Sequence, residues 1–240
     1  MGYQAVFERY EMKYVLTRPQ KQRLLARMQG RMKLDGYGRT TIRNLYFDTP
    51  DFRLIRHSLD RPVYKEKLRV RSYCRAGMDD PVFVELKKKY QSVVYKRRVS
   101  LPQAQALDWL CQGESAPEET QITREIGYFR DFYRDLQPKV FLSYEREAYY
   151  ALDGTDFRIT FDENILSREK AVTLASDIWG TPILDGELTL LEVKTFGGLP
   201  LWLTNFLTWE GIYKTSFSKY GSAYRDQIFA ARKGEKEYAG

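Results

Sequence analysis

The stretch KEKLRVRSY (Lys65–Tyr73) places a cation at every second position: Lys65, Lys67, Arg69 and Arg71. On an extended strand, successive side chains point to opposite faces of the sheet, so all four cations share one face. Like charges that lie side by side on a sheet repel each other. The stretch therefore predicts a strand whose charged face either meets solvent or lies against a strongly negative partner.

The composition is that of a folded, basic protein. The chain has 240 residues, of which 43% are hydrophobic and 15% aromatic, and this excludes a disordered chain. The formal net charge of +7 favours a polyanionic partner, such as nucleic acid, an acidic membrane surface or a phosphate-rich small molecule. No segment has the composition of a linker, so we expect one domain over residues 1–232 and a flexible tail over 233–240.

The cysteine and histidine content disfavours several chemistries. Cys74 and Cys111 form no CxxC or CxxxH pattern, so neither a zinc site nor a disulfide framework is expected. His57 is the single histidine, whereas catalytic triads and metal sites need several partners. The N-terminal residues do not resemble a signal peptide, and no apolar run approaches the ~20 residues that cross a bilayer. We expect a cytoplasmic protein without a transmembrane segment of its own.

Periodicity and turn signals predict many antiparallel strands with helices between them. The expected strands cover 7–16, 41–47, 63–73, 82–90, 93–101, 139–150, 157–161 and 188–195, with short ones near 172 and at 183–184. The expected helices cover 18 to about 32, the segment after DTPDF to about 59, 102–111, 120–136, 200–207 and 218–232. Asp48 and Asp51 are expected to cap the second helix, because Asp is a preferred N-cap residue. This order predicts an α+β fold with one barrel-like sheet.

The charged face of the opening stretch recurs on most of the expected strands. In VFVELKKKY, for example, Glu85, Lys87 and Lys89 share one face. The corresponding residues of the other strands are Arg9, Glu11, Lys13, Lys96, Arg98, Arg146, Arg158, Asp162, Glu192 and Lys194. Such faces belong either to an open sheet with a solvated side or to a closed barrel that binds a ligand inside. Inside a barrel, the charges would have to be paired or ligand-bound, and the carboxylates could hold a divalent metal ion.

The chain contains, in this order, RYEMKY, NLYFDTPDF, KEKLRVRSY, VFVELKKKY, VVYKRRV, LSYEREAY, FRITFDENI, LLEVKT and SFSKYGSAY. This series, from about Val6 to Asp226, resembles the VTC domain, the polyphosphate polymerase domain of the CYTH-like, triphosphate tunnel metalloenzyme superfamily. VTC domains occur in eukaryotic vacuolar transporter chaperone complexes and as free-standing bacterial proteins. The resemblance implies a closed antiparallel eight-stranded β-barrel with helices packed outside. It also implies ATP, triphosphate or polyphosphate, and pyrophosphate as ligands, and Mn²⁺ or Mg²⁺ as the cofactor.

The resemblance implies roles for particular residues. It gives a catalytic role, at the reacting phosphates, to Arg69, Arg71, Lys87 and Lys219. It gives substrate binding to Arg9, Lys13, Lys67, Lys96, Arg98, Tyr144, Arg146, Arg158, Lys194 and Ser218. Glu192, in LLEVK, matches the metal-binding carboxylate of the family, and Glu11, Glu85 and Asp162 are further candidates for the metal.

One departure from the superfamily bears on the activity. The triphosphatase branch opens with the pattern ExExK, whereas Arg9 here takes the place of the first glutamate, ahead of Glu11 and Lys13. The loss of a carboxylate disfavours two-metal hydrolysis, so the leading hypothesis is an ATP-dependent polyphosphate polymerase. An inorganic triphosphatase or nucleoside triphosphatase with the same tunnel, or a non-catalytic polyphosphate- or nucleotide-binding module, are the alternatives. A nucleic-acid partner is not expected, because the aromatic residues mostly fall opposite the cations. The sequence leaves open whether the protein has a separate membrane partner.

Overall fold

A computed structural model of the chain describes residues 10–91 and 93–231. The described residues form two compact units. The first unit contains residues 10–41, 144–165 and 184–217, and the second contains the remaining described residues. Two long strands, β7 (Gln137–Ala151) and β8 (Arg158–Arg168), contribute residues to both units.

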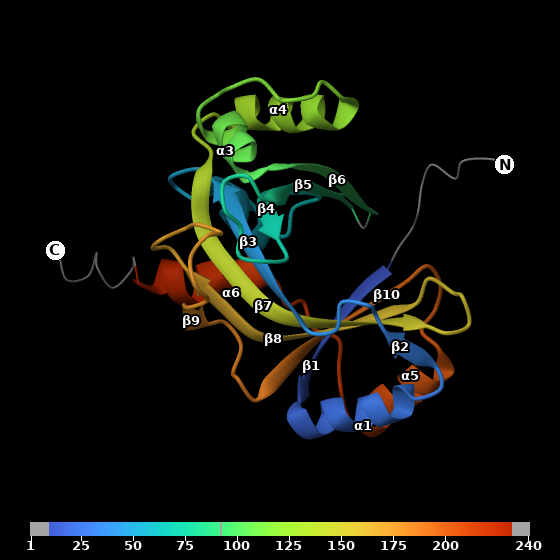
Figure 1. Cartoon of the computed structure of the whole chain (residues 1–240). Helices are drawn as coiled ribbons and strands as arrows, with labels where there is room; N and C mark the ends of the chain where they lie inside the picture. The colour runs from blue at the N-terminus through green and yellow to red at the C-terminus, as the bar shows by residue number, and fades with distance from the viewer. Residues whose placement is uncertain (1–9, 92, 232–240) are drawn as a thin grey trace. The chain divides into compact units, whose positions relative to one another are not determined.

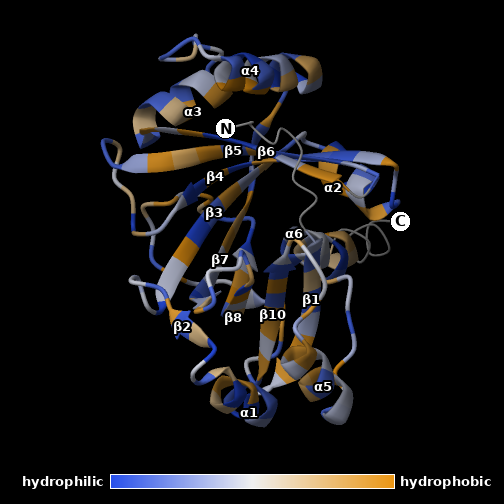
Figure 2. Cartoon of the chain, turned by 90° about the vertical axis from the view of Figure 1, so that its right-hand side faces the viewer, coloured by the Kyte–Doolittle hydropathy of each residue, from blue (hydrophilic) through white to orange (hydrophobic). Residues whose placement is uncertain are grey.

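The sheet of the first unit is antiparallel. Its strands are β1 (Tyr10–Thr17), β10 (Leu188–Thr195), β8 and β7 in that order, and the short β2 (Met32–Leu34) pairs with β7. Figure 2 shows hydrophobic and hydrophilic residues alternating along β1 and β10. One face of this sheet is therefore apolar, and the other carries the charged residues that the sequence pattern placed together.

Two helices cover the apolar face of the first unit. They are α1 (Arg18–Met28) and α5 (Leu201–Trp209), and Figure 1 shows them together beside β1 and β10. Helix α1 starts in a capping box, in which the Thr17 hydroxyl accepts from the Gln20 amide and the Gln20 side chain accepts from the Thr17 amide. The core between helices and sheet contains buried residues of each element, including Leu16, Leu24, Ile159, Phe161, Leu191, Val193, Leu203 and Phe206.

The second unit contains the strand formed by the stretch KEKLRVRSY. Its strands run in the order β7, β3 (Thr40–Asp48), β4 (Tyr64–Ser72), β5 (Pro81–Tyr90) and β6 (Val93–Pro102), and β9 (Thr181–Pro182) pairs with β8. The pairs from β3 to β6 are all antiparallel. Strands β4 to β6 form the meander expected from their turn signals.

Helices α3 (Gln103–Cys111) and α4 (Gln121–Tyr133) lie over the apolar face of this meander (Figure 1). The core beneath them contains Leu68, Val70, Val84, Leu86, Trp109, Ile126 and Phe129, each at most 2% exposed. Helices α2 (Arg53–Leu59) and α6 (Lys219–Ala223) complete the unit, and a π-helical turn at Tyr224–Phe229 continues α6. The apolar residues at every second position of β4 and β5 thus decide which face of the sheet the helices cover.

The α+β class and the antiparallel strands are confirmed, whereas some details are not. Residues near 172 form no strand, β2 was not predicted, and α1 ends at Met28 instead of about 32. Within the described residues, β1 is an edge of the first unit and β6 is an edge of the second, so neither unit closes its strands into a ring. The closed eight-stranded barrel is therefore not confirmed. The single domain stays a prediction, and the expected tail lies outside the described residues.

No helix in the described part of the chain is both long enough and apolar enough to cross a membrane.

The N-cap residue of α2 is Phe52, and Asp48, four residues earlier, accepts from backbone amides of the first turn, so its capping role is confirmed in part. The capping role predicted for Asp51 is wrong, because its carboxylate accepts from the Thr49 hydroxyl instead.

The buried Asp48 carboxylate accepts from the backbone amides of Leu54 at 2.8 Å and Ile55 at 3.0 Å, and from the Tyr220 hydroxyl at 2.8 Å. Burial raises the pKa of Asp48 against the lowering effect of these donors. The carboxylate therefore ties β3 to α2 and α6 within the second unit.

We predict that Asp48→Asn lowers the free energy of unfolding by about 2 kcal/mol, because the amide nitrogen turns a donor toward backbone donors. Urea denaturation measures the change. The control is Asp51→Asn, whose carboxylate is 64% exposed, and it should cost less than about 0.5 kcal/mol. Equal losses in the two variants would contradict this role of Asp48.

Candidate functional site

The second unit carries one strongly cationic sheet face. The residues that alternate onto this face of β4, β5 and β6 include eight cations: Lys65, Lys67, Arg69, Arg71, Lys87, Lys89, Lys96 and Arg98. Lys67, Lys87 and Lys96 lie directly opposite one another in a row across the three strands. Like charges at directly opposed positions destabilise a sheet. We call this surface the cationic face.

Glu85 is the carboxylate at the centre of the cationic face. It is 1% exposed and lies between Arg69 and Arg98 across the strands. Its Oε2 accepts from Arg69 Nε at 2.8 Å, and its Oε1 accepts from Arg98 Nε and from Lys96 Nζ, each at 2.7 Å. Arg71 Nε lies 3.9 Å from Oε2. One carboxylate thus holds four cations in place.

The electrostatics of the cationic face agree with this geometry. Burial by itself would raise the pKa of Glu85, but Arg69, Arg71 and Lys96 hold it well below its ordinary value. Burial lowers the pKa of Lys96, and the neighbouring Glu85 only partly offsets that effect. A single carboxylate does not neutralise eight cations, so the face attracts a polyanion.

Two residues that the sequence analysis missed orient the arginines. Asn44 Oδ1 accepts from Arg71 Nε at 2.9 Å, and the Tyr46 hydroxyl accepts from Arg69 at 3.0 Å. The Tyr46 ring stacks on Tyr220 with a centroid distance of 4.7 Å. The signal was present in TIRNLYF, where Asn44 and Tyr46 alternate with apolar residues and therefore share one face of β3.

The segment at the start of α6 joins the same surface. Lys67 Nζ donates to the Ser218 hydroxyl at 3.1 Å, and that hydroxyl also accepts from the Gly221 amide. Lys219, the first residue of α6, is 9% exposed and contributes to lowering the pKa of buried Tyr46, after Arg69 and Arg71. The structure therefore brings Ser218 to Lys67 on the cationic face and Lys219 near Tyr46, while the roles that the resemblance implied for these residues stay predictions.

The first unit has a second charged cluster, in which the signs alternate. Arg146 donates to both carboxylate oxygens of buried Asp162 at 2.6 Å each, and to Glu192 Oε2 at 2.9 Å. Lys13 Nζ lies 3.4 Å from Glu192 Oε1 and 3.5 Å from Glu11 Oε1. Burial by itself would lower the pKa of Arg146, but Asp162 and Glu192 raise it well above its ordinary value. We call these five residues the mixed cluster.

Three further predicted residues lie around the mixed cluster. The guanidinium of Arg146 stacks over the ring of Tyr144, 5.1 Å from its centroid. Lys194 lies opposite both Glu11 and Arg158 in the sheet register, and Arg158 stacks over the ring of Tyr150. Arg9 lies outside the described residues.

The carboxylates of the mixed cluster fit a divalent cation in a limited way. Glu11 and Glu192 approach the same ammonium group and supply hard oxygen ligands of the kind that Mg²⁺ and Mn²⁺ prefer. Across residues 10–91 and 93–231, no three His, Cys, Asp or Glu residues are arranged to hold a metal ion. The arrangement therefore suits a site where one or two carboxylates and the substrate phosphates share the ion. Glu85, surrounded by cations, has the opposite electrostatic environment.

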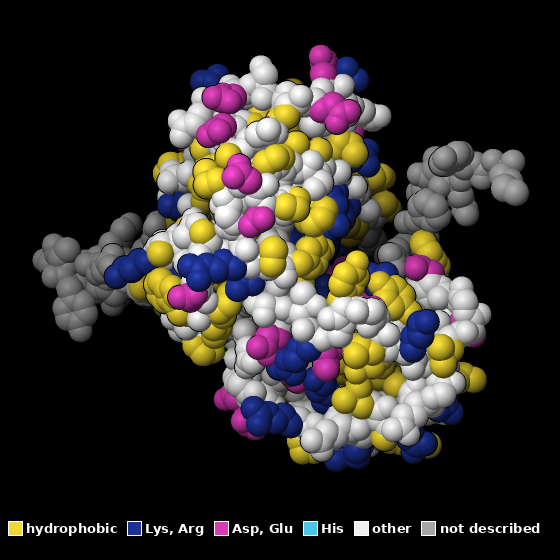
Figure 3. Space-filling view, viewed as in Figure 1, with side chains coloured by type: hydrophobic (Ala, Val, Ile, Leu, Met, Phe, Trp, Pro, Cys, Tyr) yellow, Lys and Arg dark blue, Asp and Glu magenta, His cyan; other side chains and the backbone are white. Residues whose placement is uncertain are grey.

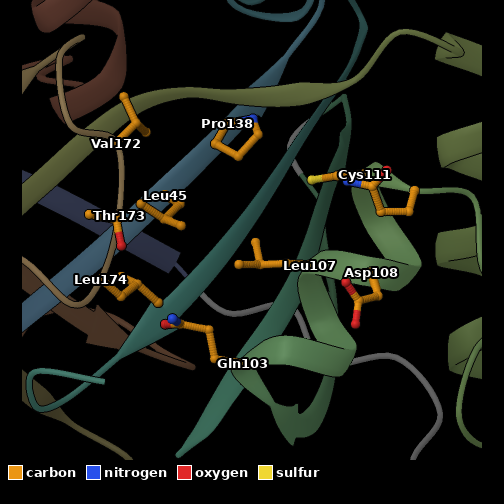
Figure 4. A pocket seen from close by; sticks show the side chains of 10 residues that line it. Leu45, Gln103, Leu107, Asp108, Cys111, Pro138, Val172, Thr173 and Leu174 are labelled. Carbon is orange, nitrogen blue, oxygen red and sulfur yellow. The ribbon is translucent and has the colours of Figure 1, made fainter. Parts of the chain in front are cut away.

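A separate cavity of about 240 Å³ lies in the second unit (Figure 4). Its lining is mostly apolar and includes Leu45, Leu107, Pro138 and Leu174. Leu45 alternates with Asn44 and Tyr46 on β3, so the cavity lies on the opposite side of that strand from the cationic face. It therefore lies apart from the cationic face.

The basic residues are not gathered on the outer surface drawn in Figure 3, where Lys and Arg side chains lie in small groups beside Asp and Glu. On the side of the molecule that this view draws, positive charge is therefore not concentrated in one patch.

Comparison with solved structures places the fold. A protein from Bacillus halodurans described as a "putative adenylate cyclase" superposes with a TM-score of 0.53 at 14% identity, covering 89% of this chain and 94% of that chain. A second such protein, from Vibrio parahaemolyticus, has a TM-score of 0.47 at 10% identity, with 91% and 98% covered. At this identity the first likeness shows that the two chains share a fold, and no more.

The sequence itself identifies the family. The family model of the VTC domain matches residues 8–226, and the chain therefore belongs to the VTC domain family. No curated protein sequence matches the chain.

We predict that Glu85→Gln lowers the free energy of unfolding at pH 7 by roughly 3 kcal/mol, because four cations lose their shared counter-charge. The folded-state pKa of Glu85 is depressed, so its contribution is present above the ordinary value of 4.5 and is lost as the pH falls below it. The difference between wild type and variant should therefore shrink on acidification.

Urea denaturation at a series of pH values measures this difference. Glu125→Gln is the matched control, because Glu125 of α4 pairs with Arg97 of β6 at a partly exposed position. This substitution should lower the free energy of unfolding by less than about 1 kcal/mol. A loss for Glu85→Gln no larger than that of the control would show that Glu85 is not needed to hold the cations together.

We further predict that Arg69→Ala weakens the binding of tripolyphosphate by about tenfold or more, because the guanidinium group that would donate paired hydrogen bonds to phosphate oxygens is removed. Arg97→Ala, which removes the same charge from the opposite face of β6, should change the affinity by less than about threefold. Isothermal titration calorimetry at fixed ionic strength measures both. Equal effects would mean that only the net charge matters.

Proposed function

We propose that this protein is an ATP-dependent polyphosphate polymerase that binds its phosphates on the cationic face. The single observation that carries the proposal is the number of positive charges there, where eight cations share one sheet face with one buried carboxylate. Membership of the VTC domain family supports the same substrate class. A linear phosphate chain carries about one negative charge per phosphate, and its repeat supplies successive partners for successive cations.

The residues of the cationic face bind and align the phosphates. Arg69 and Arg71 are held by Glu85, Tyr46 and Asn44, so their guanidinium groups are oriented before a ligand arrives. Arginine forms bidentate bonds with phosphate oxygens, and the lysines of the row through Lys87 act as compact charges. Pre-orientation lowers the entropy that would otherwise be lost when substrate binds.

The mixed cluster supplies the candidate metal ligands. We assign Glu192 and Glu11 as the residues that would hold Mg²⁺ or Mn²⁺, whereas Asp162 binds Arg146 and positions it. When bound, such an ion neutralises charge on the donor phosphates. Arg146 and Lys13 hold the carboxylates in place until then.

The proposed reaction needs no covalent intermediate with the protein. A terminal oxygen of the phosphate chain attacks the γ-phosphorus of ATP, a new P–O bond to the chain forms, and the bond to the β-phosphate oxygen breaks to release ADP. Phosphoryl transfer depends mainly on alignment and charge stabilisation, which cations supply. This fits a chain with a single histidine and two unrelated cysteines.

The test is to incubate the purified protein with ATP and Mn²⁺, with and without a short phosphate primer. We expect one phosphate to be added to the polymer for each ADP released. Release of free phosphate would favour a triphosphatase, and binding of ATP without turnover would favour a non-catalytic module. Either outcome would overturn the polymerase proposal.

We predict that Glu192→Gln lowers metal-dependent turnover by about 100-fold or more while tripolyphosphate still binds in the presence of EDTA. Glu187→Gln is the control, since its carboxylate is 72% exposed and pairs with Arg18. The two rates are compared over a range of Mn²⁺ concentrations. Near-normal synthesis by Glu192→Gln would remove Glu192 from the mechanism.

A further inference from the structure

Thr160 on β8 has a hydroxyl group that the network around it does not use. The residue is 2% exposed, and its Oγ is buried without a hydrogen-bond partner among the described residues. Buried polar groups in proteins are nearly always hydrogen-bonded, so an exception requires an explanation. A valine of the same shape would fill this position without that cost.

Thr160 lies next to the mixed cluster in the sheet of the first unit. In the register of the first unit, Thr160 lies opposite Glu192, and Glu192 lies opposite Lys13. Arg158 and Asp162, two residues away on either side, share its face of β8. The opposite face of the strand carries Ile159 and Phe161, which belong to the apolar core. The hydroxyl therefore points to the charged side of the sheet.

A second unused donor lies beside it. The Nε of Arg158 is also buried without a hydrogen-bond partner in the part of the chain that the structure describes. A guanidinium group can only donate, so its unused position calls for an acceptor. The nearby carboxylates of Glu192 and Asp162 are already bound by Lys13 and Arg146. Two neighbouring donors of this kind suit an anionic oxygen brought in by a ligand.

We propose that the Thr160 hydroxyl binds a non-bridging phosphate oxygen of the bound substrate, next to Glu192, with Arg158 as its neighbour. This inference rests on the proposed function, because it assumes that a phosphate chain reaches the mixed cluster. It adds a substrate-binding residue that carries no charge and that no charge pattern reveals. Its role is to fix the position of one phosphate relative to Glu192.

Thr160→Val and Thr160→Ser separate the hydroxyl from the shape of the side chain. We expect Thr160→Val to fold with unchanged or slightly higher melting temperature and to bind tripolyphosphate about tenfold more weakly, because a hydrogen bond to a charged group is lost. Thr160→Ser keeps the hydroxyl and should stay within about threefold of wild type. Titration calorimetry in EDTA measures binding without metal.

The control is Thr189→Val, in which another buried threonine of the same unit loses a hydroxyl that donates to Glu163 at 2.7 Å. It should lower the melting temperature but leave the affinity unchanged. Wild-type affinity in Thr160→Val would overturn the inference while the proposed function stands, and so would a weakening that appears only with Mn²⁺. Failure of the wild-type protein to bind tripolyphosphate would overturn both. If Thr160→Val does not fold, a tenfold loss in Thr160→Ser would also contradict the inference.

Discussion

Repulsion between like charges on neighbouring strands is the constraint on which the second unit depends. Three lysines oppose one another across β4, β5 and β6, and the row beside them would be equally unfavourable if it did not contain Glu85. At that position one buried carboxylate contacts four cations. The apolar core on the other face of the same strands fixes their register, so the charges cannot move apart by slipping along the sheet.

In the first unit, repulsion between like charges is avoided by alternating cations and carboxylates. In the mixed cluster each cation lies between carboxylates: Lys13 between Glu11 and Glu192, and Arg146 between Asp162 and Glu192. Its charges are close to balance without any ligand, whereas those of the cationic face are not. The two surfaces thus differ in character: the cationic face attracts anions, whereas the mixed cluster holds its carboxylates in fixed positions.

The sequence predicted the parts of this arrangement that follow from strand parity. Alternation alone put Arg69, Lys87 and Lys96 on shared faces, and capping chemistry alone put Asp48 at the start of α2. The alternation of side chains along a strand does not tell which carboxylate pairs with which cation, because that pairing depends on the register between strands far apart in the sequence. Glu85, a candidate metal ligand by resemblance, has four cations as its partners, which its place on a charged strand did not reveal.

Uncharged members of the surfaces were the hardest to predict. Asn44, Tyr46 and Thr160 alternate correctly, but polar uncharged residues are common on any sheet and carry no distinctive signal alone. Their importance appears only when their partners, or the lack of a partner, are known. The strand near 172 was predicted from local composition, which tertiary packing overrides in a segment held by its own turns.

The row of opposed lysines has a consequence for how the protein responds to its ionic surroundings. The side chains of directly opposed residues are closer together than the screening length of about 8 Å at physiological ionic strength, so added salt relieves only part of their repulsion. The same salt also competes with a phosphate chain for the cations. Salt therefore has two opposite effects on this molecule: it favours the folded state of the sheet, and it weakens the proposed binding of phosphate groups to the sheet.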